Sequence, residues 1–226
     1  MRAGQNPLPL GVLISGGGTN LQAIIDAIAD GQLPAEIRLV VSNRHDAYGL
    51  SRAERHGIPS AVLPHRGYPS RRAFEAALIS TLRERGVNLV VLAGFMRLLS
   101  PFFIRAFPQR IVNIHPGLLP AFPGLHAQRQ ALERGVRIAG ATVHFVDEEM
   151  DHGPIICQAA VPVYPDDTED SLSARILTQE HRIYPHAIRL FAEGRLEVRG
   201  RSVVVRDEVC LSDGLLAVPE PKGERG

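Results

Sequence analysis

The chain has 226 residues, and its 25 basic and 24 acidic side chains give a formal net charge of +1. This balance argues against a general affinity for nucleic acid or for an anionic membrane surface, since both call for an excess of cations. The length suits one domain with a sizeable core. We expect a single domain over residues 1–212, followed by a poorly ordered tail over residues 213–226 that is rich in Pro, Gly and Glu.

Cysteine usage and the N-terminal segment indicate the compartment. The chain contains two cysteines, Cys157 and Cys210, which predicts a reducing environment and no disulfide framework. The apolar run at residues 8–14 is too short for a membrane span and lacks the layout of a signal peptide. We therefore expect a cytoplasmic protein and interpret this run as a first strand.

Apolar, β-rich runs alternate with amphipathic stretches along the first part of the chain. The predicted strands are residues 8–14, 37–42, 60–63, 88–93, 110–115, 137–146 and 154–163. Apolar residues at helical spacing predict helices over residues 20–29, 47–55 and 70–85, each followed by a glycine. This alternation is typical of an α/β fold with a mostly parallel, doubly wound (Rossmann-like) sheet flanked by helices.

The alternation of strands and helices stops in the C-terminal part. Strands 137–146 and 154–163 are joined directly by a short polar loop, which predicts a hairpin or a crossing pair. A long helix is predicted over residues 168–191, and Pro185 is expected to kink or shorten it. Residues 195–205 are expected to add one final strand. We therefore expect the C-terminal part of the sheet to be antiparallel.

A glycine-rich turn follows the first strand and reads Ile14-Ser15-Gly16-Gly17-Gly18-Thr19-Asn20-Leu21. Glycines between a strand and a helix let backbone N–H groups approach an anion, and the helix dipole favours negative charge there. This indicates a phosphate site, although a tight turn could need the same glycines only for its backbone angles. No Gly-Lys-Ser/Thr follows, so the turn is not a Walker A loop.

A dinucleotide site has weaker support. Leu21 stands where the third glycine of that fingerprint would be, and the second strand ends in Ser42-Asn43-Arg44 without the acid that would bind the ribose of NAD. An NADP-dependent oxidoreductase, with Arg44 as the phosphate ligand, remains as an alternative.

Asn113 and His115 are the strongest candidates for chemistry. They lie two residues apart on the strand 110–115 and so share one face, and Pro116 restrains His115 to an extended conformation. Ligands of open α/β sheets bind at the carboxyl ends of parallel strands. An amide and an imidazolium can both donate to a developing oxyanion, and Asp151 is the carboxylate that would favour the charged ring. The alternative is that these polar groups merely satisfy a loop.

Two other kinds of site are less well supported. His144, Asp151, His152 and Cys157 match no compact metal-binding spacing, so we expect no metal. No Gly-x-Ser-x-Gly elbow occurs, so we expect no serine nucleophile. We expect His144 to lie on one face of its strand and Cys157 to pack as a small hydrophobe.

Glu180 lies on the apolar face of the predicted long helix, a face formed by Leu172, Ile176, Ile183 and Ala187. A carboxylate on such a face is costly unless it finds a partner. Glu180 therefore either pairs with a neighbouring arginine or meets a polar ligand.

Taken together, these segments resemble the phosphoribosylglycinamide formyltransferases, a family of folate-dependent enzymes of purine synthesis. The resemblance extends from residue 9 to about residue 200 and rests on residues 14–21, 70–71, 92–100, 113–120, 123–126, 151–154 and 179–181. The Asn-x-His-Pro-x-Leu-Leu-Pro element at 113–120 is shared by folate enzymes that handle formyl groups, and the glycine-rich loop and the Gly-Phe-Met-Arg segment narrow the choice. Gly17 and Gly117 depart from the family, which often has Asn at the first position and Ser or Ala at the second.

The resemblance implies a role for each matching residue. The implied catalytic residues are Asn113, His115 and Asp151. The residues implied to bind the ribonucleotide substrate are Gly18, Thr19 and Asn20 at its phosphate, with Glu180 at its polar portion. The residues implied to border 10-formyltetrahydrofolate are Arg71, Met96, Arg97, Leu98, Leu99 and Asn113.

The implied reaction transfers the formyl group of 10-formyltetrahydrofolate to the amine of 5-phosphoribosyl-glycinamide through a tetrahedral intermediate, giving formylglycinamide ribonucleotide and tetrahydrofolate. The partners would be small molecules, with no nucleic acid or membrane, and the chain could form a homodimer. The alternatives are a methionyl-tRNA formyltransferase, a formyltetrahydrofolate deformylase or a nonenzymatic nucleotide-binding module. Both alternative enzymes carry a further domain, for which we expect too little chain here, and the intact Asn113, His115 and Asp151 argue against the module.

Overall fold

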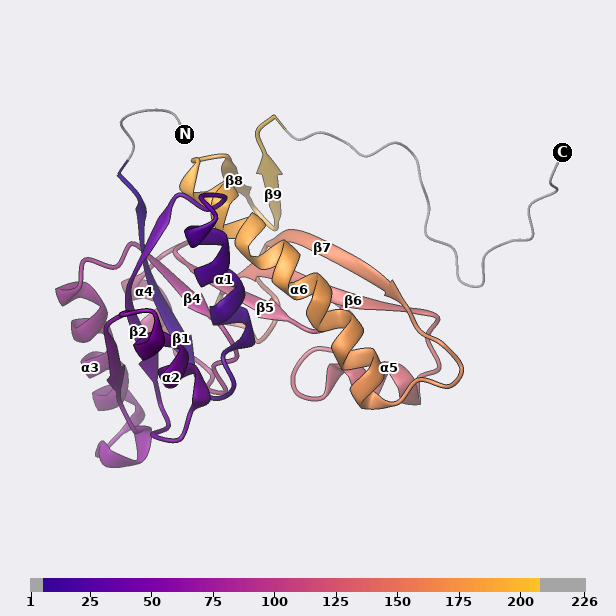
Figure 1. The fold of residues 1–226 in the computed structure, drawn as a ribbon, viewed down its shortest axis with the longest axis horizontal. Coiled ribbons are helices and arrows are strands. Elements are labelled where there is room, and N and C mark those ends of the chain that lie inside the picture. Colours follow the sequence, from indigo (N-terminus) through magenta and orange to yellow (C-terminus); the bar gives the residue numbers. More distant parts are fainter. Residues whose placement is uncertain (1–5, 208–226) are drawn as a thin grey trace, which may run out of the picture.

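The structure of the protein is a computed structural model that describes residues 6–207. Within this range the chain forms a nine-stranded sheet with helices packed on both of its faces (Figure 1). The predicted tail over residues 213–226, and Cys210, lie outside the described residues. The single domain expected over residues 1–212 stays a prediction.

The strands of the sheet are connected in a doubly wound order. In chain order they are β1 (Leu8–Ile14), β2 (Ala35–Ser42), β3 (Ser60–Val62), β4 (Leu89–Leu92), β5 (Ile111–His115), β6 (Ile138–Phe145), β7 (Ile155–Pro162), β8 (Leu196–Arg199) and β9 (Ser202–Val205). Across the sheet the order is β3-β2-β1-β4-β5-β6-β7-β9-β8. Strands β1 to β5 pair in parallel, whereas β6 is antiparallel to both of its neighbours.

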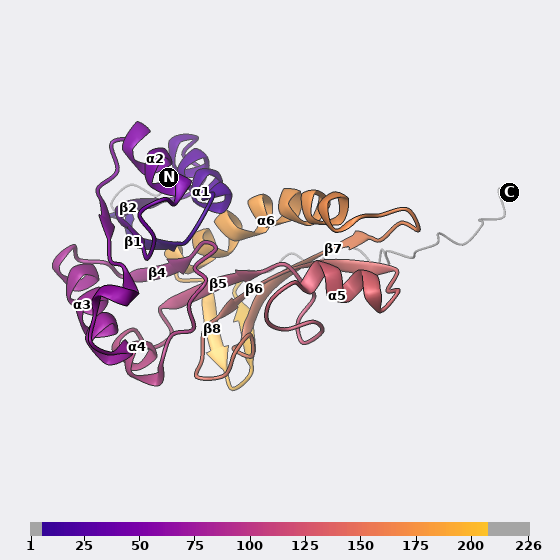
Figure 2. The same ribbon diagram turned by 90° about the horizontal axis from the view of Figure 1, so that it is seen from below.

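The helices divide between the two faces of the sheet. They are α1 (Thr19–Ala29), α2 (Tyr48–Arg55), α3 (Arg71–Glu84), α4 (Pro101–Ala106), α5 (Ala127–Glu133) and α6 (Glu169–Ala192), with a 3-10 turn, η1, at His65–Gly67. Figure 2 shows α1, α2 and α6 on one side of the sheet and α3 and α4 on the other. Each side buries its own apolar core, one containing Leu21, Ile24 and Ile188 and the other Phe74, Leu78 and Phe103.

The predicted fold class is confirmed, and so is the antiparallel hairpin of β6 and β7. One strand prediction is wrong. Residues 195–205 form two short antiparallel strands, β8 and β9, instead of a single strand. The reason is the turn between them, where Gly200 adopts a φ of 62°, a left-handed conformation that glycine takes at little cost.

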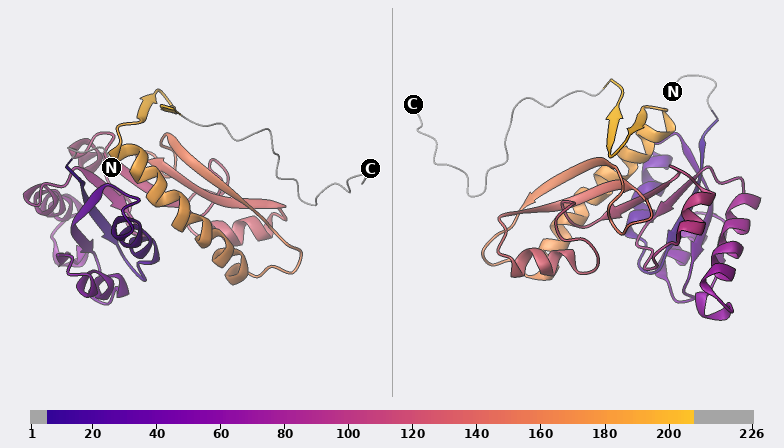
Figure 3. Two further views of the ribbon diagram at one scale, coloured as in Figure 1. Left: turned by 45° about the horizontal axis from the view of Figure 1, so that its top comes forward. Right: turned by 180° about the vertical axis from the view of Figure 1, so that it is seen from behind.

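One of the two effects expected of Pro185, a shortened helix, is wrong, while the kink stays a prediction. Helix α6 continues through this proline to Ala192 and is not shortened. Figure 3 shows α6, the long orange helix, lying along the sheet, and it packs on β6 and β7. Around the proline, Tyr184, Ala187 and Ile188 are almost completely buried. We attribute the continuation to this packing, because tertiary contacts can offset the hydrogen bond that a proline removes.

The topology brings the candidate site to one edge of the sheet. The parallel strands β1, β4 and β5 are neighbours in the order β1-β4-β5, so their carboxyl ends lie side by side. The glycine-rich turn follows β1, the segment 93–100 follows β4, and the His115-Pro116 corner ends β5. This edge is where open α/β sheets usually bind their ligands.

Candidate active site

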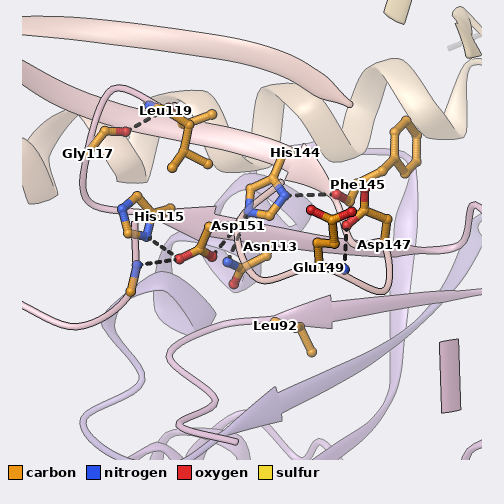
Figure 4. A network of polar contacts seen from close by, with 12 residues as sticks. Leu92, Asn113, His115, Gly117, Leu119, His144, Phe145, Asp147, Glu149 and Asp151 are labelled. Atoms are coloured by element: carbon orange, nitrogen blue, oxygen red, sulfur yellow. Dashed lines mark hydrogen bonds and ion pairs between the residues drawn. The ribbon is translucent and has the colours of Figure 1, made fainter. Parts of the chain in front are cut away.

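A polar network centred on His115 lies at the end of β5 (Figure 4). The ring is buried, with 3% of the residue exposed, and both of its nitrogens face oxygen atoms. Its Nε2 donates to the carbonyl oxygen of Phe122 at 2.8 Å, and its Nδ1 lies 3.4 Å from Oδ2 of Asp151. Because a neutral imidazole carries one N–H, only the protonated ring can donate to both oxygens at once.

Asn113 joins this network through a histidine on the neighbouring strand. Its Nδ2 lies 3.2 Å from Nε2 of His144, and the two residues are paired in register between β5 and β6. The Nδ1 of His144 donates to the carbonyl oxygen of Phe145 at 2.8 Å, which leaves Nε2 as the acceptor of the amide. Burial lowers the pKa of His144 below its ordinary value of 6.5, and this favours the neutral ring that the arrangement requires.

The structure thus brings Asn113, His115 and Asp151 together, with His144 between two of them. Oδ1 of Asp151 lies 3.8 Å from Nε2 of His144, while Oδ2 faces His115. The sequence placed His144 on a strand face and assigned it no part in the site. Its cross-strand position opposite Asn113 is the signal that could have found it, once the antiparallel register was known.

Two residues that make polar contacts with the His115 ring, Phe122 and Asp151, both have an uncommon backbone conformation. Phe122 and Asp151 have φ angles of 55° and 53°, in the left-handed region that residues with side chains seldom adopt. The Oδ2 of Asp151 also accepts from the backbone N–H of Gly124 at 2.7 Å. Strain of this kind persists where surrounding contacts hold it, and it is commonly found at functional sites.

Gly117, one of the two departures from the family pattern, lies directly against the His115 ring. A Cβ added at this glycine would stand 3.0 Å from Nε2 and 3.1 Å from Cδ2 of that ring. A side chain at this position would therefore crowd the imidazole. Gly117 leaves that space open and adds no polar group to the site.

The glycine-rich turn forms one wall of a cavity of about 850 Å³. Gly18 caps α1 with a φ of 68°, and a Cβ there would stand 2.7 Å from the Cα of Gly49, so this backbone approach leaves room only for glycine. Arg66 and Arg97 also line the cavity. None of the described residues that line it is acidic. The cavity is therefore suited to an anion.

Arg44 also borders this cavity, but its guanidinium is engaged by Asp46, with hydrogen bonds of 2.9 Å and 2.7 Å. That carboxylate raises the pKa of Arg44, although the pair is fully exposed and adds little to stability. Arg44 therefore has less freedom to bind a 2′-phosphate than the NADP alternative assumed.

Glu180 finds its partner on α1. Its Oε2 accepts a hydrogen bond from Nδ2 of Asn20 at 2.7 Å, and both side chains are buried. Burial raises the pKa of Glu180, and the Asn20 amide offsets part of that rise. The arginine pairing considered from sequence is wrong, since no ion pair of Glu180 occurs among residues 6–207 and an amide takes that place. The Oδ1 of Asn20 is buried and has no hydrogen-bond partner among residues 6–207, which leaves it able to accept from a ligand.

Four of the residues expected at the folate, Met96, Arg97, Leu98 and Leu99, lie on the segment 94–100, which we call the donor segment. Met96 and Leu98 are exposed apolar side chains, at 66% and 63%. Arg71 reaches this segment from α3, and its Nη2 donates to the carbonyl oxygen of Leu98 at 2.6 Å. Sequence reasoning missed two residues that hold the segment: Ser15, whose Oγ accepts from the N–H of Met96, and the buried Glu75.

The residues considered as metal ligands do not gather around one point. No group of three or more His, Cys, Asp or Glu side chains suited to a metal ion occurs among residues 6–207. Cys157 packs against the core as expected, and burial raises the pKa of its thiol to about 12. Within the described part of the chain, no helix is long and apolar enough to cross a membrane.

Comparison with known proteins agrees with this geometry. The formyl transferase family model matches residues 10–188. The chain is 51% identical over 187 residues to the phosphoribosylglycinamide formyltransferase of Escherichia coli (strain K12), covering 83% of this chain and 88% of that protein. It is 52% identical over 185 residues to the trifunctional purine biosynthetic protein adenosine-3 of Drosophila melanogaster, and the match covers 81% of this chain but 14% of that much longer protein.

A solved structure shares the fold. The crystal structure of glycinamide ribonucleotide transformylase 1 from Symbiobacterium toebii superposes with a TM-score of 0.89 at 57% identity, covering 91% of this chain and 97% of that one. These matches favour this family over the tRNA formyltransferase, the deformylase and the binding module considered from sequence. The chain therefore belongs to the formyl transferase family, and within it to the phosphoribosylglycinamide formyltransferases, enzymes of purine biosynthesis.

Proposed function

We propose that this enzyme transfers the formyl group of 10-formyltetrahydrofolate to the amine of 5-phosphoribosyl-glycinamide. The observation that carries the proposal is the network of Asn113, His115 and Asp151 at the end of β5. The neighbouring strand β4 leads into a cavity that the glycine-rich turn also lines. An oxyanion-stabilising group and an anion site at one sheet edge are what formyl transfer to a phosphorylated amine requires.

The ribonucleotide would bind at the turn and the first residues of α1. Gly18, Thr19 and Asn20 line the cavity, and the N-terminal end of α1 has no side-chain cap, so its backbone N–H groups can receive a phosphate. The buried Oδ1 of Asn20 can accept from a hydroxyl of the ribose, next to the carboxylate of Glu180. These contacts would orient the amine toward β5.

The folate would bind along the donor segment. The exposed Met96 and Leu98, with Leu99, would offer apolar contact to a pterin ring, and Arg97 would offer positive charge to an anionic part of the same molecule. Arg71, which pairs with Glu75, would border the folate and hold the segment at Leu98. Asn113 lies one strand away, because β4 and β5 pair through Leu92 and Asn113. The formyl carbon would therefore lie between the donor segment and the catalytic residues.

In the proposed reaction the amine attacks the formyl carbon, and the carbonyl oxygen becomes an oxyanion. Asn113 and the protonated His115 would donate hydrogen bonds to it. Since Nε2 of His115 donates to the Phe122 carbonyl in the structure, this N–H would exchange that oxygen for the oxyanion when the substrates bind. Asp151 would keep the ring charged and oriented.

The intermediate then collapses with cleavage of the bond to N10 of the folate. One proton leaves the attacking nitrogen and one reaches the departing nitrogen, so the reaction consumes none overall. His115 and Asp151 would support this proton transfer. No covalent bond to the protein forms along this path.

The two small-molecule substrates suit a cytoplasmic enzyme that needs neither nucleic acid nor a membrane. A homodimer is compatible with the proposal, and sedimentation velocity would measure it.

The test is an assay with both purified substrates that follows tetrahydrofolate formation and identifies the product by mass. We expect tetrahydrofolate to appear only when the phosphorylated amine is present, and glycinamide without its ribose phosphate to react far more slowly. Tetrahydrofolate formation that does not depend on the amine would instead indicate a deformylase.

A further inference from the structure

Glu75 is a buried carboxylate that the proposed reaction does not use. It lies in the second turn of α3 with 1% of the residue exposed. A buried carboxylate is costly unless hydrogen-bond donors surround it. Its Oε1 accepts from Nε of Arg71 at 3.2 Å and from the backbone N–H of Ser100 at 2.8 Å, and its Oε2 accepts from the hydroxyl of Ser100.

These three hydrogen bonds all act on the donor segment. Ser100 is the last residue of that segment, and Glu75 holds both its backbone and its side chain. Arg71, which Glu75 orients through the contact to Nε, donates its Nη2 to the carbonyl oxygen of Leu98. One buried carboxylate therefore fixes two positions of the segment, one directly and one through Arg71.

Ser100 gives up another interaction to make this contact. It is the N-cap residue of α4, where a serine hydroxyl normally accepts from a backbone N–H of the first turn. Here Ser100 makes no side-chain cap to α4 and turns its hydroxyl toward Glu75. The Ser100 hydroxyl therefore fixes the end of the donor segment to Glu75 and does not cap α4.

The other end of the donor segment is held by a different residue. Ser15 donates its backbone N–H to the carbonyl oxygen of Gly94 at 3.0 Å, and its Oγ accepts from the N–H of Met96 at 2.8 Å. Ser15 begins the glycine-rich turn, so the N-terminal end of the segment is tied to the ribonucleotide side of the site. The side-chain hydrogen bonds that hold the C-terminal end come from Arg71 and Glu75 of α3.

We propose that Glu75 is a positioning residue for the formyl donor, which it affects through Arg71 and Ser100 without touching the substrate. The inference rests on the proposed binding of the folate along the donor segment. Loss of Glu75 releases Leu98 and Ser100 but leaves the contacts of Ser15 and the glycine-rich turn in place. Its removal therefore weakens binding of the folate and spares binding of the ribonucleotide.

The test is steady-state kinetics of Glu75→Gln with each substrate varied in turn. The amide keeps one acceptor oxygen and can meet the Ser100 hydroxyl only as a donor, so the variant loses the negative charge that strengthens the hydrogen bonds from Arg71 and Ser100. We expect the KM for 10-formyltetrahydrofolate to rise about tenfold, the size expected for losing a charged hydrogen bond. The KM for the ribonucleotide is expected to stay within about twofold.

Glu84→Gln is the matched control, because Glu84 lies on the same helix and also accepts from a serine hydroxyl, Ser80, but is exposed. It should leave both KM values unchanged. Ser100→Ala is the milder variant and keeps the backbone contact to Glu75, so it should raise the folate KM about threefold with the same selectivity. If Glu75→Gln does not fold, Ser100→Ala tests the same proposal.

Equal changes in both KM values, or an unchanged folate KM in a folded variant, would overturn the positioning role. Failure of the proposed function has a different signature, since the wild-type enzyme would then show no amine-dependent formyl transfer at all.

Discussion

The amide of Asn113 donates to Nε2 of His144, its partner in the antiparallel register of β5 and β6. Since Nδ1 of His144 donates to the carbonyl oxygen of Phe145, the histidine is held in one tautomer, and that tautomer orients the Asn113 amide. One amide N–H is used in this contact, and the other is free for an oxyanion. A neutral histidine thus orients the amide proposed as one donor, while His115, proposed as the second donor, lies between the carbonyl oxygen of Phe122 and the carboxylate of Asp151.

Stability should fall as the solution becomes more acidic, with His144 as one cause. Its pKa is lowered in the folded state by burial, so the unfolded chain binds its proton first. The contribution of the neutral His144 ring to the unfolding free energy is therefore fully present above the ordinary pKa of 6.5. It declines as the pH falls from there toward the lowered pKa. Denaturant unfolding between about pH 5 and about pH 7.5 should show this slope.

The variant His144→Gln should have a shallower slope over the same range, although His181 and His186, whose pKa values burial also lowers, will keep part of it. A slope as steep as that of the wild type would mean that His144 is not a source of the pH dependence.

Glu180→Gln should separate stability from function. Burial raises the pKa of Glu180, so the folded state favours the protonated carboxyl, and its contribution to stability falls as the pH rises from the ordinary value of 4.5 through the raised one. A glutamine keeps an acceptor for Asn20 and carries no charge to bury. We expect this variant to be more stable than the wild type at neutral pH.

The same variant should bind the ribonucleotide more weakly, with its KM raised about tenfold, because the charged acceptor for a polar substrate group is gone. The exposed Glu54 of α2 offers a control, and Glu54→Gln should change neither quantity. A variant that loses both stability and binding would show that Glu180 has mainly a structural role.

Cys157 should be inert toward thiol reagents in the folded protein. Burial raises the pKa of its thiol to about 12, so only about one molecule in ten thousand carries the reactive thiolate at pH 8. In the variant Cys210→Ser, which leaves Cys157 as the remaining thiol, labelling by a disulfide reagent should be slow until denaturant is added. Rapid labelling in the native state would contradict the burial of this side chain.

The sequence predicted the elements of the fold well because the strands are buried and their apolar runs are continuous. It missed the turn at Gly200, since a two-residue turn within a short polar run leaves little signal. It also allowed Pro185 to shorten α6, but the helix continues to Ala192 because the neighbours of the proline are buried. At Pro185, local preference yields to tertiary packing.

The candidate site was predictable only in part. Asn113 and His115 share a strand, and their relation follows from the alternation of side chains. The partners of Asn20 and Glu75 depend on contacts across 160 and 25 residues of chain, which no local pattern reveals. The role of His144 depends on the register of β5 against β6, and a shift by one residue would have pointed it to the other face.

The central claim is that Asn113, His115 and Asp151 act together on the formyl transfer step, and Asp151→Asn tests it most directly. The substitution removes the charge beside His115 and changes little volume, so substrate contacts should persist. We predict that kcat falls by at least about a hundredfold, as expected for loss of acid–base support, while both KM values stay within about threefold. A variant with kcat near that of the wild type, or with its loss confined to KM, would contradict the assignment.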